Sequence, residues 1–136
     1  MDTVSLRPTE YPALQMPDKA GIRIHAIVCH ETNGPPLIRL AGICQCTQQE
    51  SLNLPKTILH GVTVVLVYGQ DHLPVSFQAI GDAIVFDDDI IRIGDLLRGY
   101  FEIDLFKQSG SRPLAGTYFV SAASGPHLSN VVKIEI

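Results

Sequence analysis

The residues of this chain best suited to chemistry are His25, Cys29, His30, Cys44 and Cys46. Because strand side chains repeat every two residues, His25 and Cys29 would share one strand face, and Cys44 and Cys46 would share a face of the next strand. Thiolates and imidazoles are ligands that zinc and copper prefer. The spacing matches no Cys-x-x-Cys pattern, however, and a thiol in an apolar strand packs as a small hydrophobe. We favour core cysteines and predict no cofactor; a metal site on His25, Cys29, Cys44 and Cys46 is the alternative.

An acidic run, Asp87-Asp88-Asp89, offers the oxygen ligands that calcium prefers. It lacks the alternating ligands, the central glycine and the distal glutamate of an EF-hand loop. A solvated acidic turn that keeps neighbouring strands from pairing edge to edge is the interpretation we favour. Asp87 and Asp89 remain candidate ligand-binding residues.

Two histidines, His72 and His127, lie in predicted loops, where binding residues are often found. If both loops emerge at one end of the domain, they could line a site with the acidic turn, for a small ligand or a carbohydrate, with calcium assisting. The sequence contains no Gly-x-Ser-x-Gly elbow, no phosphate-binding Gly-Lys-Ser loop and no Gly-x-Gly-x-x-Gly. Because no catalytic ingredients converge, we predict that the chain is not an enzyme.

Aromatic side chains lie mainly inside predicted strands, which is typical of core packing, and tryptophan is absent. The alternation of side chains along a strand turns Tyr100 and Phe119 away from the core. These two residues are therefore candidates for an interface with another protein. A register shift of one residue would invert this assignment.

Charge and hydropathy argue against two classes of partner. The net charge is −4 and the 10 lysines and arginines are scattered, so no basic stripe is available to bind nucleic acid. The longest apolar run, 64–68, is far shorter than the ~20 residues of a transmembrane helix. The N-terminus does not read as a secretory signal and the 3 cysteines cannot all pair, which predicts a cytoplasmic protein, or a secreted one if the chain is a processed product.

Short segments with the period-two alternation of strands fill most of the chain, separated by turn residues. The segment 57–69 alternates little, which predicts a central strand buried on both faces. The segment 90–97 is ambiguous and fits a short strand that leads into one helical turn. Polar connections are expected at 47–56 and 107–114. The other predicted strands are 21–29, with Ile22, Ile24, Ala26 and Val28 on one face, and 37–46, 74–80, 99–106, 116–124 and 129–136, with a turn at 33–36.

The end of the chain carries a resemblance to a known fold. Gly116-x-Tyr118-x-Val120, followed by 129–136, resembles the last two strands of immunoglobulin-like sandwiches, and 99–105 is similar to the preceding strand in macroglobulin-like and bacterial immunoglobulin-like accessory domains. The resemblance covers only this last stretch, and the tryptophan and final-strand cysteine of antibody domains are absent. It implies that Tyr118 is a buried tyrosine-corner residue whose hydroxyl bonds to the backbone.

These observations predict one all-β domain over residues 1–136, an antiparallel immunoglobulin-like β-sandwich of about 8–9 strands, with 1–20 as a loosely packed N-terminal arm. We expect a non-enzymatic module that acts through protein–protein contact, in an accessory or assembly role. The partner would be another protein or a second copy, and the C-terminal strand 131–136 is the expected donor to a partner's sheet. The alternative is a carbohydrate- or small-ligand-binding domain.

Overall fold

The computed structural model describes residues 14–17, 19–29, 37–52, 57–81, 83, 85 and 90–136. The acidic turn with Asp87 and Asp89, the turn at 33–36, and His30 lie outside the described residues. So does most of the predicted N-terminal arm.

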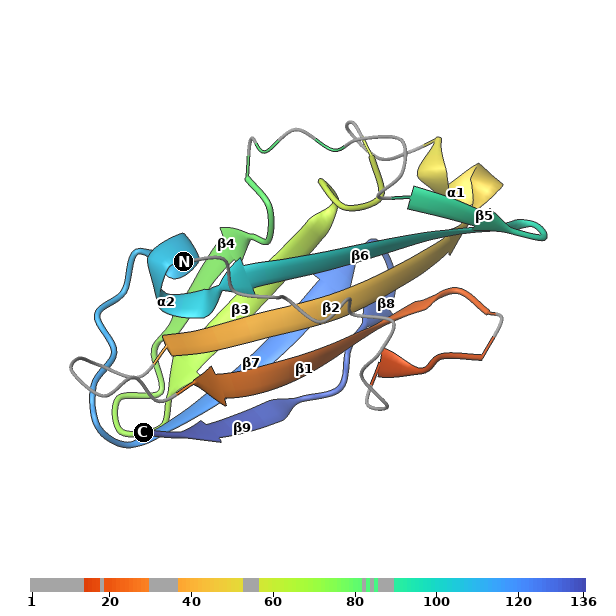
Figure 1. Cartoon of the computed structure of the whole chain (residues 1–136). Coiled ribbons are helices and arrows are strands. Elements are labelled where there is room, and N and C mark those ends of the chain that lie inside the picture. The colour runs from red at the N-terminus through yellow and green to blue at the C-terminus, as the bar shows by residue number, and fades with distance from the viewer. Residues whose placement is uncertain are drawn as a thin grey trace.

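Two antiparallel sheets pack face to face, which confirms the prediction of an all-β sandwich (Figure 1). One sheet has the order β1-β2-β6-β5, and the other has β4-β3-β7, with β8 and β9 both pairing with β7. The strands are β1 (Gly21–Cys29), β2 (Leu37–Thr47), β3 (Val62–Tyr68), β4 (Pro74–Gln78), β5 (Ile90–Ile93), β6 (Leu96–Asp104), β7 (Thr117–Ser124), β8 (His127–Leu128) and β9 (Val132–Glu135), with short helices α1 (Gln48–Ser51) and α2 (Leu105–Ser109).

The core fills the space between the two sheets, where alternate side chains of facing strands meet. The ring of Phe101 on β6 lies over Gly42 on β2, its cross-strand partner, at a place where a β-carbon would overlap the ring. Burial of this apolar surface drives the sheets together at roughly 25 cal/mol per Å². The most completely buried core side chains include Ile24, Ile38, Leu40, Cys44, Val62, Val64 and Val120.

The central strand β3 differs from its prediction in length and in burial. It begins at Val62, because residues 58–61 form turns. Its residues alternate: Val64 and Leu66 are buried, whereas Val65 and Val67 are partly exposed. The prediction of burial on both faces is wrong, because the outward-facing side chains are only partly buried.

Two helical turns replace connections that the sequence predicted as polar loops. α2 begins at Asp104, whose side chain accepts from the Lys107 amide, and ends at Gly110 in the left-handed conformation with φ 73°. α1 begins with a capping box between Thr47 and Glu50. In 90–97 the expected helical turn is instead the tight turn of the β5-β6 hairpin.

The described part of the N-terminal arm contacts the four-stranded sheet. Leu14 is only 1% exposed and lies with Ala41 and Ile43 on the outer face of the four-stranded sheet. The Gln45 side chain donates to the carbonyls of Pro17 at 2.9 Å and Lys19 at 2.7 Å. These contacts fix the segment across one end of the sheet.

Candidate functional site

The proposed metal ligands do not converge. His25 and Cys29 share the outer face of β1, and Cys44 and Cys46 share the inner face of β2, so the two pairs point to opposite sides of one sheet. The ladder also separates them, since Cys29 pairs with Leu37 at one end and Cys44 with Ile22 toward the other. Among the described residues no group of three histidine, cysteine, aspartate or glutamate side chains could hold a metal ion.

The inner cysteines behave as core residues. The Cys44 thiol donates to the Ser124 hydroxyl on the opposite sheet at 3.4 Å. Burial raises the pKa of the Cys44 thiol, while the contact with Ser124 opposes that shift. Burial also raises the pKa of Cys46 to about 11, with the nearby Cys44 adding to it. A thiol that stays protonated at neutral pH is a poor nucleophile and a poor metal ligand.

Helix α1, which directly follows β2, meets the β7-β8 turn. Nε2 of His127 lies 2.7 Å from a carboxylate oxygen of Glu50. The Thr47 amide, which donates to the same carboxyl group, is the main cause that lowers the pKa of Glu50, and His127 lowers it further. The pair joins the α1 cap to the edge of the five-stranded sheet, and it accounts for His127 structurally.

The second histidine lies far from the first. Val62 pairs with Ser124 and Tyr68 pairs with Tyr118 in the β3-β7 ladder. The β3-β4 loop with His72 follows Tyr68, whereas the turn before His127 follows Ser124, so the two loops emerge at opposite ends of the sheet. A joint site of His72 and His127 is therefore not formed, and Asp87 and Asp89 lie outside the described residues.

Tyr100 points away from the core, as the alternation predicted, but it is not open. It is paired with Ile43 and packs against the small outer cluster of Leu14, Ala41 and Ile43. The rest of this face is mixed. It carries an Arg39–Glu102 pair at 2.6 Å and the apolar side chain of Ile91 on β5, which is 47% exposed. The outer face of the four-stranded sheet is thus partly covered by its own chain.

Phe119 also points outward, and its surroundings are different. It is 39% exposed and lies opposite Val67 and Lys133 on the outer face of the five-stranded sheet. A hollow of about 380 Å³ beside it is lined by residues that include Gly69, Thr117 and Lys133. We call the outer side chains of β3 and β7 the uncovered face; its residues are Thr63, Val65, Val67, Phe119, Ser121 and Ala123.

The uncovered face is apolar and nearly free of charge. The strands β3, β4 and β7 contain no lysine, arginine, aspartate or glutamate. Within the described part of the chain, charge reaches this sheet's outer side only on β9, where Lys133 and Glu135 pair with each other at 3.1 Å. Phe119 is the exposed large side chain of this face, and Val65 and Val67 are half-buried.

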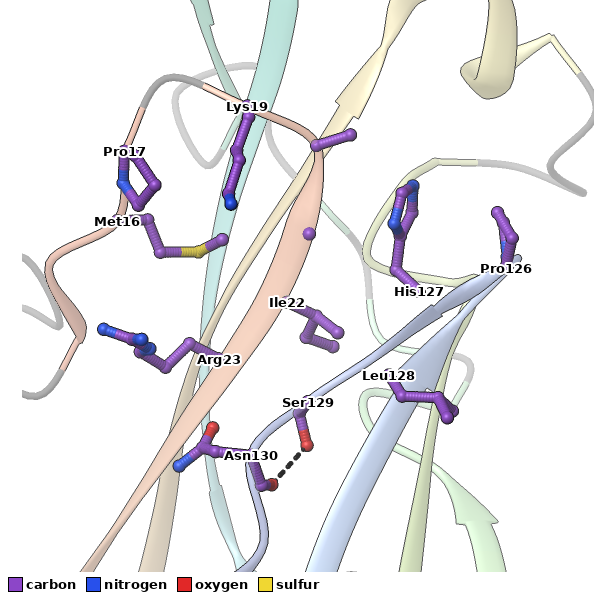
Figure 2. Close-up of a pocket in the computed structure, with 12 residues that line it drawn as sticks. Met16, Pro17, Lys19, Ile22, Arg23, Pro126, His127, Leu128, Ser129 and Asn130 are labelled. Carbon is purple, nitrogen blue, oxygen red and sulfur yellow. Dashed lines mark hydrogen bonds between the residues drawn. The ribbon is translucent and has the colours of Figure 1, made fainter.

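A groove between β1 and β8 is the feature that the sequence did not predict. Figure 2 shows β1 on one side and the segment 127–130 on the other. Its volume is about 460 Å³, and Lys19 and Arg23 stand at its rim. The side chain of Asn130 spans the edge of β1, with Oδ1 accepting from the Ile24 amide at 2.9 Å and Nδ2 donating to the Ile24 carbonyl at 3.0 Å. A lone asparagine in a turn carries no sequence signal for such a contact.

No helix in the described part of the chain is long and apolar enough to span a membrane. The comparisons with known proteins identify no relative: no family model, no curated protein and no solved structure matches this chain.

Proposed function

We propose that this protein is a non-enzymatic module that acts through contact with another protein, and that the uncovered face makes this contact. The observation that carries the proposal is the asymmetry between the two sheets. One outer face holds the Arg39–Glu102 ion pair and is overlaid in part by residues 14–17. The other exposes Phe119 and leaves Val65 and Val67 half-buried, without a covering segment among the described residues.

The chemistry of the face favours a protein over a small polar ligand. Apolar side chains on two adjacent strands offer a broad, flat contact, and burying them gains roughly 25 cal/mol per Å². Aromatic residues in such a patch commonly carry much of the binding energy, and Phe119 is the aromatic side chain of this face, opposite Val67 at one end of it. A sugar or a nucleotide would require converging hydrogen-bond groups, which this face does not offer.

The C-terminal strand is a weaker candidate for the contact than the sequence indicated. β9 pairs with β7, and Ile136 exchanges two main-chain hydrogen bonds of 2.9 Å with Gly116. Withdrawing this strand from its own sheet for donation would break that ladder, whereas pairing a partner strand along its other edge would not. The uncovered face needs no such rearrangement.

We also propose that the sandwich belongs to the immunoglobulin-like type. The order β1-β2-β6-β5 corresponds to the A-B-E-D sheet of that fold, and β4-β3-β7-β9 corresponds to C′-C-F-G. Tyr118 at the start of β7 is 4% exposed, and its hydroxyl accepts from the Leu114 amide at 2.9 Å. This is the contact expected of a tyrosine corner. The fold assignment does not by itself support the contact proposal.

The test is a capture experiment in which three versions of the full chain serve as bait in an extract of the native source. Wild type is compared with Phe119→Asp, which places a charge on the uncovered face, and with Arg112→Glu, a charge change in an exposed loop. We expect at least one protein to be retained by wild type and Arg112→Glu and depleted about tenfold or more with Phe119→Asp, because burying an unpaired carboxylate costs several kcal/mol.

Circular dichroism and thermal unfolding of all three baits establish that each is folded. Light scattering on the same samples covers the case in which the partner is a second copy, since a dimer would then dissociate only with Phe119→Asp. Equal retention of every captured protein by all three folded baits, together with a monomeric wild type, would overturn the proposal.

A further inference from the structure

At the edge of β1, a side chain pairs with the outward main-chain groups of Ile24, whereas those of the neighbouring Ile22 face the groove. Asn130 presents its carboxamide to the Ile24 main chain as a peptide group of a neighbouring strand would. The Ile24 amide and carbonyl therefore point outward, away from β2. Because main-chain groups in an antiparallel strand alternate in direction, the amide and carbonyl of Ile22 also point outward, into the groove.

The opposite wall of the groove is a second open strand edge. The Ser129 amide donates to the Ala122 carbonyl on β7 at 2.8 Å, so Ser129 faces β7. By the same alternation, the amide and carbonyl of Leu128 point away from β7. In the described part of the chain no hydrogen bond reaches the groove-side main chain of Ile22 or Leu128. The groove thus lies between two strand edges. On each edge, a main-chain amide and carbonyl have no hydrogen-bond partner among the described residues.

The rim of the groove carries positive charge in a chain whose net charge is −4. Lys19 is exposed, and the Arg23 guanidinium donates to the Gln15 carbonyl at 3.0 Å. Among the described lining residues there is no aspartate or glutamate, and the described part of the chain places no carboxylate in an ion pair with Lys19 or Arg23. His127 is the lining residue that already has an acidic partner, Glu50.

We propose that this groove binds an extended acidic peptide segment of a partner protein, whose main chain lies along the two strand edges. Main-chain hydrogen bonds to Ile22 and Leu128 would hold the peptide backbone, and carboxylates at alternate positions would face Lys19 and Arg23. The site is separate from the uncovered face, so it stands or falls independently of the contact proposed there.

The test uses the full isotope-labelled chain and a blocked hexapeptide that alternates glutamate and valine, followed by amide-resolved NMR. We expect chemical-shift changes at residues 21–23 and 127–130, and slower amide exchange at Ile22 and Leu128. Two control peptides isolate the contributions: one replaces each glutamate by lysine, and the other carries N-methyl groups on alternate backbone nitrogens. Both should bind about tenfold more weakly or not at all.

Charge-swapped variants give the matched protein control. Lys19→Glu with Arg23→Glu should weaken binding of the acidic peptide about tenfold and gain binding of the lysine peptide, whereas Arg112→Glu should change neither. Both altered positions are exposed, and thermal unfolding verifies that the double variant is folded.

Three results would overturn the proposal. One is binding of the acidic peptide that leaves 21–23 and 127–130 unperturbed, or no binding at millimolar peptide. Another is equal binding of the N-methylated peptide or of a single-stranded oligothymidylate, which would reduce the site to nonspecific anion attraction. The third is a wild-type dimer that dissociates in the Lys19→Glu Arg23→Glu variant, which would make a second copy the occupant.

Discussion

Gly42 lies where the core is packed so closely that a single added methyl group would overlap a neighbouring side chain. The Phe101 ring occupies the space that a β-carbon would need. Gly42→Ala should therefore lower the free energy of unfolding by about 1–3 kcal/mol, as overpacking does elsewhere. Urea unfolding measures the loss.

The companion variant for this site is Phe101→Leu, which removes the ring. The loss of unfolding free energy in the Gly42→Ala Phe101→Leu double variant should be smaller than the sum of the two single losses, because the smaller side chain leaves room for the added methyl group. Strict additivity of the two losses would show that Gly42 is not held by this contact.

The buried thiols predict how stability responds to alkaline pH. Cys46 has its pKa raised from 9.0 to about 11 in the fold, so the unfolded chain loses the thiol proton first as pH rises. The contribution is fully present below pH 9.0 and is lost as pH rises through about 11. We expect Cys46→Ala to show a shallower fall in unfolding free energy between these pH values than wild type, measured by urea unfolding. Parallel curves would contradict the buried, protonated thiol.

At the scale of elements, Asn130 joins the two sheets along their open edges. It holds β1 through two hydrogen bonds to Ile24. Asn130→Ala should lower the free energy of unfolding by about 1–3 kcal/mol, since two main-chain groups lose their partner. The sharper readout is amide hydrogen exchange, in which the Ile24 amide should exchange faster while that of Leu40, inside the β2 ladder, changes little.

Lys133→Ala on the neighbouring exposed strand is the matched control. It removes a solvated side chain of β9 and should leave exchange at Ile24 unchanged. If Asn130→Ala and Lys133→Ala gave the same Ile24 exchange rate, Asn130 would not be closing this edge.

The contact between Cys44 on β2 and Ser124 on β7 offers a way to link the sheets covalently. Their side-chain atoms are 3.4 Å apart and their positions are 80 residues apart in sequence. Ser124→Cys should form a disulfide with Cys44 under mild oxidation and raise the free energy of unfolding by about 2–4 kcal/mol, because closing so long a loop restricts the unfolded chain.

Peptide mapping identifies the cysteine that pairs with position 124, and reduction should abolish the gain in stability. Cys46 lies on the same face of β2 and serves as the internal control. A bond to Cys46 in place of Cys44, or an oxidised protein less stable than the reduced one, would contradict the register of the two sheets at this end.

The sequence was a good guide to strands whose two faces differ. In β1, Ile22 and Ile24 alternate with exposed Arg23, and in β7 Tyr118 and Val120 alternate with Phe119, so period two carries the burial pattern. It misled in β3, where valines occupy both faces because the outer face is apolar without being covered. The lack of alternation in the sequence of β3 is therefore a consequence of the apolar side chains on the uncovered face.

Neither helix α2 nor the groove could be predicted from such a local pattern. Phe101, Ile103 and Leu105 continue the period-two alternation of a strand. The sequence pattern therefore does not indicate that α2 has its N-terminal cap at Asp104 and its C-terminal cap at Gly110. The groove depends on Asn130 meeting a strand 106 residues away, and no local pattern encodes a contact at that separation. The failed grouping of His72 with His127 has the same origin, because only the β3-β7 register reveals that their loops lie at opposite ends.

At the scale of the whole molecule, the two sheets have unequal outer faces. The four-stranded sheet is covered at Leu14 and elsewhere carries an ion pair and the exposed Ile91, while the five-stranded sheet presents Val65, Val67 and Phe119 on β3 and β7. Stability of the sandwich alone does not require Phe119 to be aromatic, because its side chain lies outside the core. The proposed contact with another protein would account for the apolar side chains that this face presents.

Hydroxyl-radical footprinting of the full chain, alone and after return to an extract of its native source, tests this central claim most directly. We predict that oxidation of Phe119 falls several-fold in the extract-assembled sample. Leu52, 83% exposed just after α1, and Leu114, 50% exposed in the loop before β7, should keep their oxidation rates relative to each other. Unchanged oxidation of Phe119 in a sample where the chain has entered a larger assembly, or protection of Leu52 in its place, would contradict it.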